Sequence, residues 1–140
     1  MRWRNRFRAL ATTTALTGLI LVGQASSPAF AVAAGCTATG VSGTVNVDGY
    51  TAGSHNYPYV YLSLADTAAD GHHVRIRFIS LSAAGPHTYY PWHALYDGNG
   101  TSTGWSTSAY SAATTAGFAV QAAVYEGDDQ IRYCTDYKWY

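Results

Sequence analysis

The 140-residue chain is 48% hydrophobic, 14% aromatic and only 11% charged. Half of its eight basic residues lie before residue 9, so residues 32–140 keep four basic residues against eight acidic ones, a net charge of −4. This balance argues against binding driven by nucleic-acid phosphates or anionic lipid, both of which attract a basic patch. Low charge combined with many aromatic and β-branched residues also argues against a disordered chain.

Residues 1–31 have the three parts of a secretory signal peptide. A basic stretch over residues 2–8 is followed by an apolar, threonine-rich run over residues 9–22 and by a small-x-small pattern that ends at Ala31. We expect cleavage after Ala31, with cleavage after Ala33 as the alternative. The apolar run is short for a transmembrane helix, so the expected product is a secreted, extracellular protein without stable membrane insertion.

The two cysteines, Cys36 and Cys134, lie near the two ends of the expected mature domain, residues 32–140. In an exported protein this count predicts one disulfide, for which the chain-entropy model gives about 4 to 5 kcal/mol when the loop is so long. The less favoured alternative is a lipoprotein, because residues 33–36 loosely resemble a lipobox, but acylation of Cys36 would leave Cys134 without a partner. A chain of about 109 residues forms a single domain that buries a core of its own, so the disulfide is an addition to that core.

The first half of the domain predicts three half-buried strands, over residues 41–48, 57–64 and 73–81. In each of them apolar side chains alternate with polar or aromatic ones, as in a strand with one buried face. Pro58 is expected to mark the beginning of the second strand, because proline cannot donate to an interior ladder. Tyr59 and Tyr61 fall on the outward face of that strand.

The second half of the domain is less regular. Residues 88–96 predict a strand interrupted by Pro91, which favours a sheet edge or a bulge. Residues 103–110 alternate again. Residues 118–134 predict a β-hairpin with its turn over residues 126–129, where glycine and aspartate supply turn chemistry, and we expect this hairpin to end at Cys134.

About seven short strands, separated by Gly, Pro, Asn and Asp clusters and without a convincing helical period, predict an all-β fold. The expected architecture is an antiparallel β-sandwich, broadly immunoglobulin-like, with a small β-barrel as the alternative. The specific immunoglobulin marks are not found, since Tyr133 directly precedes Cys134 instead of lying two residues before it, and we expect no cysteine near the middle of an early strand. The expected core contains Val45, Val60, Leu62, Val74, Ile76, Phe78, Phe118, Val120 and Val124.

The basic leader and the Ala-, Gly- and Thr-rich composition resemble those of small exported actinobacterial proteins with no assigned activity. The resemblance rests on no specific motif and carries no functional residue over to this chain. Function therefore has to come from the residues themselves.

Tyrosine and tryptophan are the compositional outlier, with 12 and 4 residues. Exposed rings can form a flat surface on which sugar rings or apolar ligands stack. The competing and stronger interpretation is that strands favour aromatic residues and that many of these rings fill the core. The candidate ligand-binding residues are Tyr59, Tyr61, Tyr90, Trp92 and Trp105, of which Tyr59 and Tyr61 are the least explained by a core.

Metal binding has weak support in the sequence. Zinc or copper would need imidazoles from neighbouring strands, but the histidines show no known spacing signature, and solvated or structurally bonded histidines are the favoured interpretation. Calcium would need about six or more oxygen ligands, and the acidic stretches at residues 97–101 and 126–129 are better explained as exposed turns. No metal or other cofactor is expected. The histidines concerned are His72, His73, His87 and His93.

Catalytic motifs are missing, among them G-x-S-x-G, H-E-x-x-H and a phosphate-binding glycine loop. The favoured function is a non-enzymatic extracellular binding module that contacts a carbohydrate, cell-surface or protein partner, because aromatic side chains on a rigid scaffold give large contact area at low entropic cost. The alternative is a secreted inhibitor of an extracellular hydrolase, which would present a loop at residues 83–87 or 97–104 to an active site. A small hydrolase that uses His and Asp residues ranks third.

Overall fold

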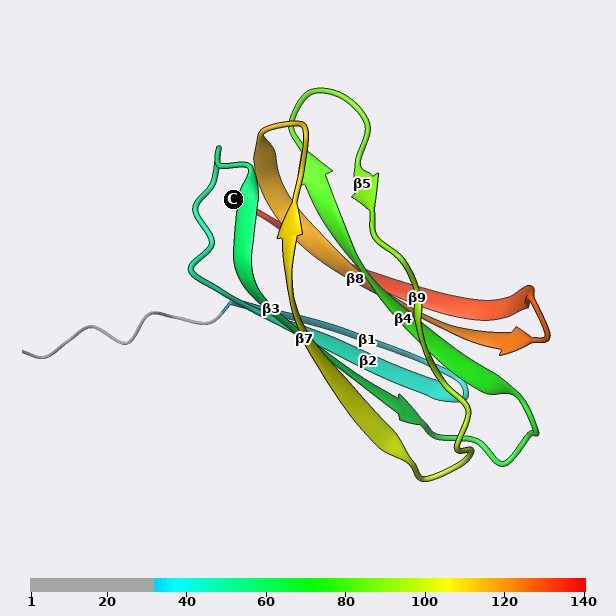
Figure 1. Cartoon of the computed structure of the whole chain (residues 1–140). Helices are drawn as coiled ribbons and strands as arrows, with labels where there is room; N and C mark the ends of the chain where they lie inside the picture. Colours follow the sequence, from blue (N-terminus) through cyan, green and yellow to red (C-terminus); the bar gives the residue numbers. More distant parts are fainter. Residues whose placement is uncertain (1–31) are drawn as a thin grey trace, which may run out of the picture.

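The computed structural model describes residues 32–140, which consist of β-strands and their connections (Figure 1). The predicted signal peptide, residues 1–31, lies outside the described residues. Within residues 32–140 there is no helix that is long and apolar enough to cross a membrane. The strands are β1 (Val32–Ala38), β2 (Val41–Asp48), β3 (Asn56–Asp66), β4 (His73–Ser82), β5 (Thr88–Tyr89), β6 (His93–Leu95), β7 (Ser102–Tyr110), β8 (Thr115–Glu126) and β9 (Asp129–Trp139).

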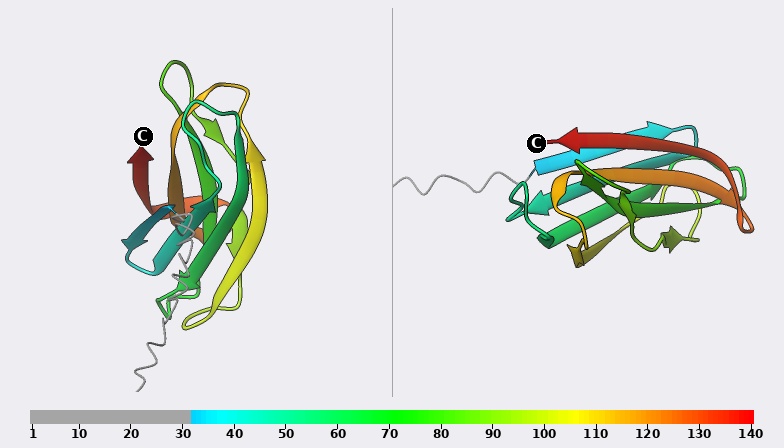
Figure 2. Two further views of the ribbon diagram at one scale, coloured as in Figure 1. Left: turned by 90° about the vertical axis from the view of Figure 1, so that its left-hand side faces the viewer. Right: turned by 90° about the horizontal axis from the view of Figure 1, so that it is seen from above.

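These strands form two antiparallel sheets that stack as a sandwich (Figures 1 and 2). Sheet A has the order β1-β2-β3-β7, and sheet B has the order β5-β4-β8-β9, with β6 also paired to β4. The chain passes from one sheet to the other after β3, β6 and β7. Both sheets are open, so the predicted all-β sandwich is confirmed, and the barrel alternative is wrong.

The described residues form nine strands where about seven were expected. β1 is not among the predicted strands, because its small residues show no alternation, and it pairs with β2 along its whole length. Cys36 lies in this strand, so the expectation that no early strand contains a cysteine near its middle is wrong. The strand predicted over residues 88–96 is divided at Pro91 into β5 and β6. Both pair with β4 at the edge of the sheet, which is the position that Pro91 predicted. One extra strand, β1, therefore comes from pairing that the sequence pattern does not show, and the other comes from the division of a predicted strand at Pro91.

Two predicted strand ends are wrong. β3 begins at Asn56, and Pro58 lies in a bulge where Pro58 and Tyr59 face the single residue Ser108 of β7. A bulge leaves a residue outside the ladder, so the missing N–H of proline costs no hydrogen bond there. The hairpin also continues past Cys134 to Trp139, because β9 stays paired with β8 along this length. Its turn falls at residues 127–128, inside the predicted range.

The core lies between the sheets and contains every residue predicted for it. The fully buried Tyr57 joins them: Phe78 and Phe118 pack edge-on against its ring, and its hydroxyl donates to the Gly117 carbonyl. β2 shows the strict alternation of a strand with one buried face. β8 departs from its predicted pattern, since both of its faces are buried.

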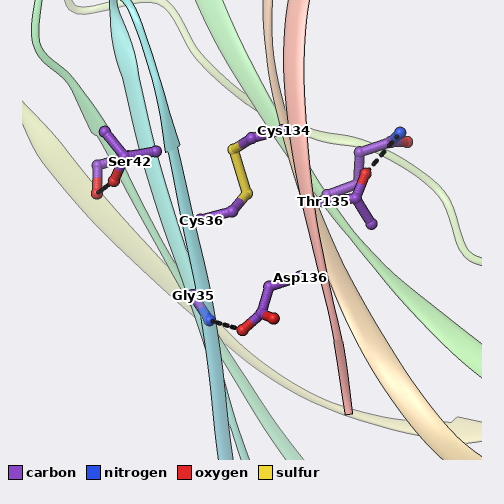
Figure 3. The surroundings of a disulfide bond; sticks show 8 residues. Gly35, Cys36, Ser42, Cys134, Thr135 and Asp136 are labelled. Atoms are coloured by element: carbon purple, nitrogen blue, oxygen red, sulfur yellow. Dashed lines mark hydrogen bonds between the residues drawn. A yellow bond between two sulfur atoms is a disulfide. The ribbon is translucent and has the colours of Figure 1, made fainter. Parts of the chain in front are cut away.

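One side of the sandwich is closed covalently (Figure 3). Cys36 on β1 and Cys134 on β9 form the predicted disulfide, with Cα atoms 5.7 Å apart and a sequence separation of 98. Beside it, the Gly35 N–H donates to Asp136 Oδ2 at 3.0 Å. These contacts join the outer strand of sheet A to the outer strand of sheet B, and β1 and β9 run side by side (Figure 2).

The opposite side, which we call the open side, is formed by β7 and by β5 and β6. Two contacts hold one end of it: Tyr90 Oη donates to the Tyr110 carbonyl at 2.6 Å, and Thr88 Oγ1 lies 3.3 Å from Ser111 Oγ. Farther along the same side, the rings of Trp105 and His93 stack with centroids 4.9 Å apart. In residues 32–140, side chains from both sheets hold this side, whereas the other side is joined by the disulfide.

Candidate functional site

The five candidate ligand-binding residues lie on three surfaces. Tyr59 and Tyr61 are on the outer face of sheet A, where the alternation of β3 places them. Tyr90 and Trp105 lie on the open side and pack partly against the core. Trp92 lies on the outer face of sheet B, over Arg77. The structure therefore brings together only the pair that the sequence marked as least explained by a core.

Tyr59 and Tyr61 are 68% and 46% exposed and line a shallow hollow of about 170 Å³. We call it the Tyr59–Tyr61 hollow. Its polar residues come from the strands on either side, and they offer amide, carboxylate and hydroxyl groups. They are Asn46 and Asp48 from β2, and Ser106 and Thr107 from β7.

The ring of Tyr61 lies across β7 because residue 104 is glycine. A Cβ atom at this position would lie 2.7 Å from Cζ and 3.0 Å from Cε2 of the Tyr61 ring, closer than such atoms can approach. A cross-strand aromatic ring that covers a glycine is a known device for pinning a sheet. The ring therefore covers the glycine with its outer end, and its remaining surface is exposed to solvent.

Charge divides the two sheets. The strands of sheet A contain no lysine or arginine, and the four basic residues of the described chain lie on β4 and β9 of sheet B. Asp48 is the single ionisable side chain besides the two tyrosines in the lining of the Tyr59–Tyr61 hollow. Hydrolysis of a glycosidic bond normally uses a pair of carboxyl groups, and the lining contains one.

A deeper pocket of about 310 Å³ opens on the open side, and we call it the open-edge pocket. Its floor consists of the core residues Leu62 and Phe78. Its walls come from β7 and from the connection between β5 and β6. The wall residues are Tyr90, Pro91, His93, Thr107, Ser108 and Ala109.

Tyr90 serves this pocket as a wall and as a brace between the sheets. Its ring lies 5.4 Å from that of Phe78, centroid to centroid. Burial raises the pKa of Tyr90 to about 12, with the neighbouring Tyr57 as a smaller cause. The phenol is therefore protonated at neutral pH and donates its hydrogen bond to the Tyr110 carbonyl.

The structure also shows an exposed aromatic row that sequence reasoning missed. Tyr133, Tyr137 and Trp139 alternate along β9 and are 60%, 49% and 55% exposed on the outer face of sheet B. The sequence did contain evidence for this row, because the alternation of side chains with a period of two residues continues past Cys134. The expectation that the hairpin ends at that cysteine concealed it.

The histidines have structural partners. His72 Nδ1 lies 3.1 Å from Asp70 Oδ2, and the Arg75 Nε–H donates to His73 Nε2 at 3.0 Å. Burial, with the Arg75 charge as a second cause, lowers the pKa of His73 and favours the neutral ring that accepts this bond. Within the part of the chain that the structure describes, no three His, Cys, Asp or Glu side chains gather closely enough to hold a metal ion.

The fold and the hollow together define a small disulfide-linked β-sandwich with an aromatic surface rimmed by hydrogen-bonding groups. No family model matches the chain, and no curated protein or solved structure is significantly similar to it. Its function has to be inferred from the geometry described above.

Proposed function

We propose that the protein is a non-enzymatic extracellular binding module that contacts a carbohydrate through the Tyr59–Tyr61 hollow. The observation that carries the proposal is the ring of Tyr61, fixed across Gly104 beside the exposed ring of Tyr59. Two aromatic rings held on a sheet need little ordering when a ligand binds, so little conformational entropy is lost.

The chemistry of the hollow suits a sugar. A pyranose ring has an apolar face of C–H groups, which stacks on aromatic rings, and a rim of hydroxyls, which needs donors and acceptors. Asn46, Asp48 and Ser106 supply such groups beside the tyrosines. Because sheet A carries no basic residue, a neutral sugar fits better than a sulfated or phosphorylated one.

The shape of the hollow favours a polysaccharide over a small free sugar. Sites for small molecules usually enclose most of the ligand, whereas this hollow is shallow and lies on an open sheet face. A chain that continues beyond the hollow can add contacts along the same face, which is lined with serine, threonine and asparagine.

The test is retention of the purified secreted protein on a panel of neutral insoluble polysaccharides. We expect retention on at least one of them, and we expect the double variant Tyr59→Ala, Tyr61→Ala to lose about fivefold or more in affinity, because two stacking contacts of about 0.5–1.5 kcal/mol each disappear. The matched control is Tyr133→Ala, Tyr137→Ala, which removes two equally exposed tyrosines from β9. Equal loss in both double variants, or no retention of the wild type, contradicts the proposal.

The alternative function, inhibition of an extracellular hydrolase, has one structural observation in its favour. The connection between β4 and β5 projects from one end of the sandwich (Figure 1), and its residues 83–86 are exposed. Its base is braced, since Ser82 Oγ donates to the Ala84 carbonyl at 2.9 Å and the Ser82 N–H donates to His87 Nδ1 at 3.3 Å. Stoichiometric inhibition of a protease, together with no retention on any polysaccharide, would favour this alternative.

A further inference from the structure

The basic side chains of sheet B are not equivalent. Three of the four that the described chain contains form ion pairs with carboxylates. The exception is Arg77, which forms no ion pair with any described residue although this part of the chain carries a net negative charge. The three pairs are Arg75 with Asp128, Arg132 with Asp70, and Lys138 with Asp136.

Arg77 is nevertheless held firmly in one position. Its guanidinium carbon lies 4.5 Å from the ring centroid of Tyr89 and 4.4 Å from that of Trp92. Its Nε–H donates to Gln121 Oε1 at 2.7 Å, and Gln121 in turn donates from Nε2 to Thr135 Oγ1 at 3.2 Å. We call this arrangement of Arg77, Tyr89, Trp92 and Gln121 the Arg77 clamp.

The clamp leaves one edge of the guanidinium available. The two terminal amino groups make no hydrogen bond to the described residues, yet they are not among the buried polar atoms that lack a partner, so they reach solvent. The aromatic rings remove water from around the charge, and burial lowers the pKa of Arg77, which Tyr125 and Tyr89 offset in part. A fixed and partly desolvated charge without an anionic partner costs free energy, part of which a bound anion would recover.

We propose that the Arg77 clamp binds the carboxylate of a small, singly charged ligand whose remaining part is apolar. A planar carboxylate can accept two parallel hydrogen bonds from the terminal amino groups of a guanidinium. A single charge matches the one unpaired cation, whereas a dianion or a polyanion would be repelled by the net charge of −4. The apolar part of the ligand would contact Tyr89 and Trp92, whose rings border the exposed edge.

The first experiment needs no variant. Benzoate is titrated into the isotopically labelled protein at neutral pH, and benzamide, which has nearly the same shape but no charge, is titrated in parallel. We expect benzoate to bind in the millimolar range and to shift the signals of the Arg77 Nε–H and of the Gln121 side-chain amide, and benzamide to shift neither. Equal shifts with both compounds, no shift with benzoate, or tighter binding of inorganic phosphate than of benzoate would overturn the proposal.

Two substitutions sharpen this test. Gln121→Glu places a carboxylate against the Arg77 Nε–H and gives the guanidinium an internal partner, so we expect benzoate affinity to fall about tenfold or more with the fold retained. Arg75→Gln makes the net charge more negative by the same one unit, but at a guanidinium already paired with Asp128, and we expect less than about a twofold change. Equal losses in the two variants would show that benzoate responds only to net charge and would overturn the assignment. The double variant Tyr59→Ala, Tyr61→Ala lies on the other sheet and is expected to bind benzoate normally.

Discussion

The phenol of Tyr90 helps to hold the two sheets together on the open side. Tyr90 donates to the Tyr110 carbonyl across this side, and it can do so only while it is protonated. Burial raises its pKa from the ordinary value of 10.0 to about 12. The unfolded chain therefore loses this proton at a lower pH than the folded protein does. The stabilisation is complete below pH 10 and is lost as the pH rises through about 12.

The raised pKa of Tyr90 gives a testable pH dependence of the free energy of unfolding. We expect the free energy of unfolding of Tyr90→Phe, measured by urea denaturation between about pH 9 and about pH 12, to fall less steeply than that of the wild type. Tyr57 and Tyr140, whose pKa values burial also raises, contribute to both curves and cancel in the comparison. Tyr59→Phe removes an exposed phenol and serves as the control for the loss of a tyrosine hydroxyl. Parallel curves for Tyr90→Phe and the wild type would contradict the assignment of the brace.

For single residues, the sequence pattern predicts which face of a sheet a side chain occupies. It does not predict which other side chains lie around it. The alternation of β3 was enough to place Tyr59 and Tyr61 on the outer face. The position of the Tyr61 ring depends on Gly104, which lies diagonally across the β3–β7 pairing, and the bulge at Pro58 sets the register of that pairing. No local pattern contains this register. The Arg77 clamp was missed for the same reason, because its parts come from β4, β5, β8 and the connection between β5 and β6.

Among the strands, the two sheets approach each other closely at Gly43 of β2. A Cβ atom there would lie 2.7 Å from Cβ of Ala122 on β8 and 3.0 Å from Cδ1 of Ile76 on β4. Ala122 and Ile76 are themselves fully buried core residues. An added methyl group therefore has no free space and must displace a strand or a side chain.

We expect Gly43→Ala to lower the free energy of unfolding by about 1–3 kcal/mol in chemical denaturation, the usual cost of overpacking. Ala122→Gly removes the nearest atom, so the double variant is expected to lose less stability than the sum of the two single variants. Thr44→Ala, at the exposed neighbouring position, serves as the control and is expected to change little. Strict additivity of Gly43→Ala and Ala122→Gly would show that the sheets move apart without cost at this point.

The elements differ in how much of their surroundings the sequence predicts. β2 faces solvent on one side, and its alternation predicts both faces correctly. β8 lies between β4 and β9, and its outer residue Gln121 is covered by Arg77 and Thr135 from those neighbours. Small residues such as Ala119 and Ala123 suit either environment, so the pattern of β8 could not show that its second face is also buried.

For the molecule as a whole, the disulfide strengthens a core that is already continuous between the sheets. We expect the variant Cys36→Ala, Cys134→Ala to remain folded at 25 °C and to lose up to about 4–5 kcal/mol in the free energy of unfolding, measured by urea denaturation, since the bond closes a loop with a sequence separation of 98. The variant should bind polysaccharide and benzoate as the wild type does, because neither site touches the cysteines. Complete unfolding would show that the core is insufficient, and unchanged stability would show that the closed side is held by packing alone.

The overall architecture could be predicted because many short alternating segments in a chain of this length have few other solutions. The distribution of basic residues and candidate sites between the two sheets could not be predicted. Sheet A is free of basic residues and carries the Tyr59–Tyr61 hollow, and sheet B carries all the basic residues of the described chain and the Arg77 clamp. This separation depends on strand order, which is set by contacts between segments far apart in the sequence.

The position of the disulfide also determines how the domain responds to mechanical force. Cys36 and Cys134 lie close to the first and last described residues, so tension applied through the chain on either side passes from β1 to β9 through the sulfur–sulfur bond. Only the few residues outside the cysteines can be peeled away before the covalent link bears the load, and the strands between them are shielded. Reduction of this one bond would release a segment that extends to about 320–350 Å when pulled straight.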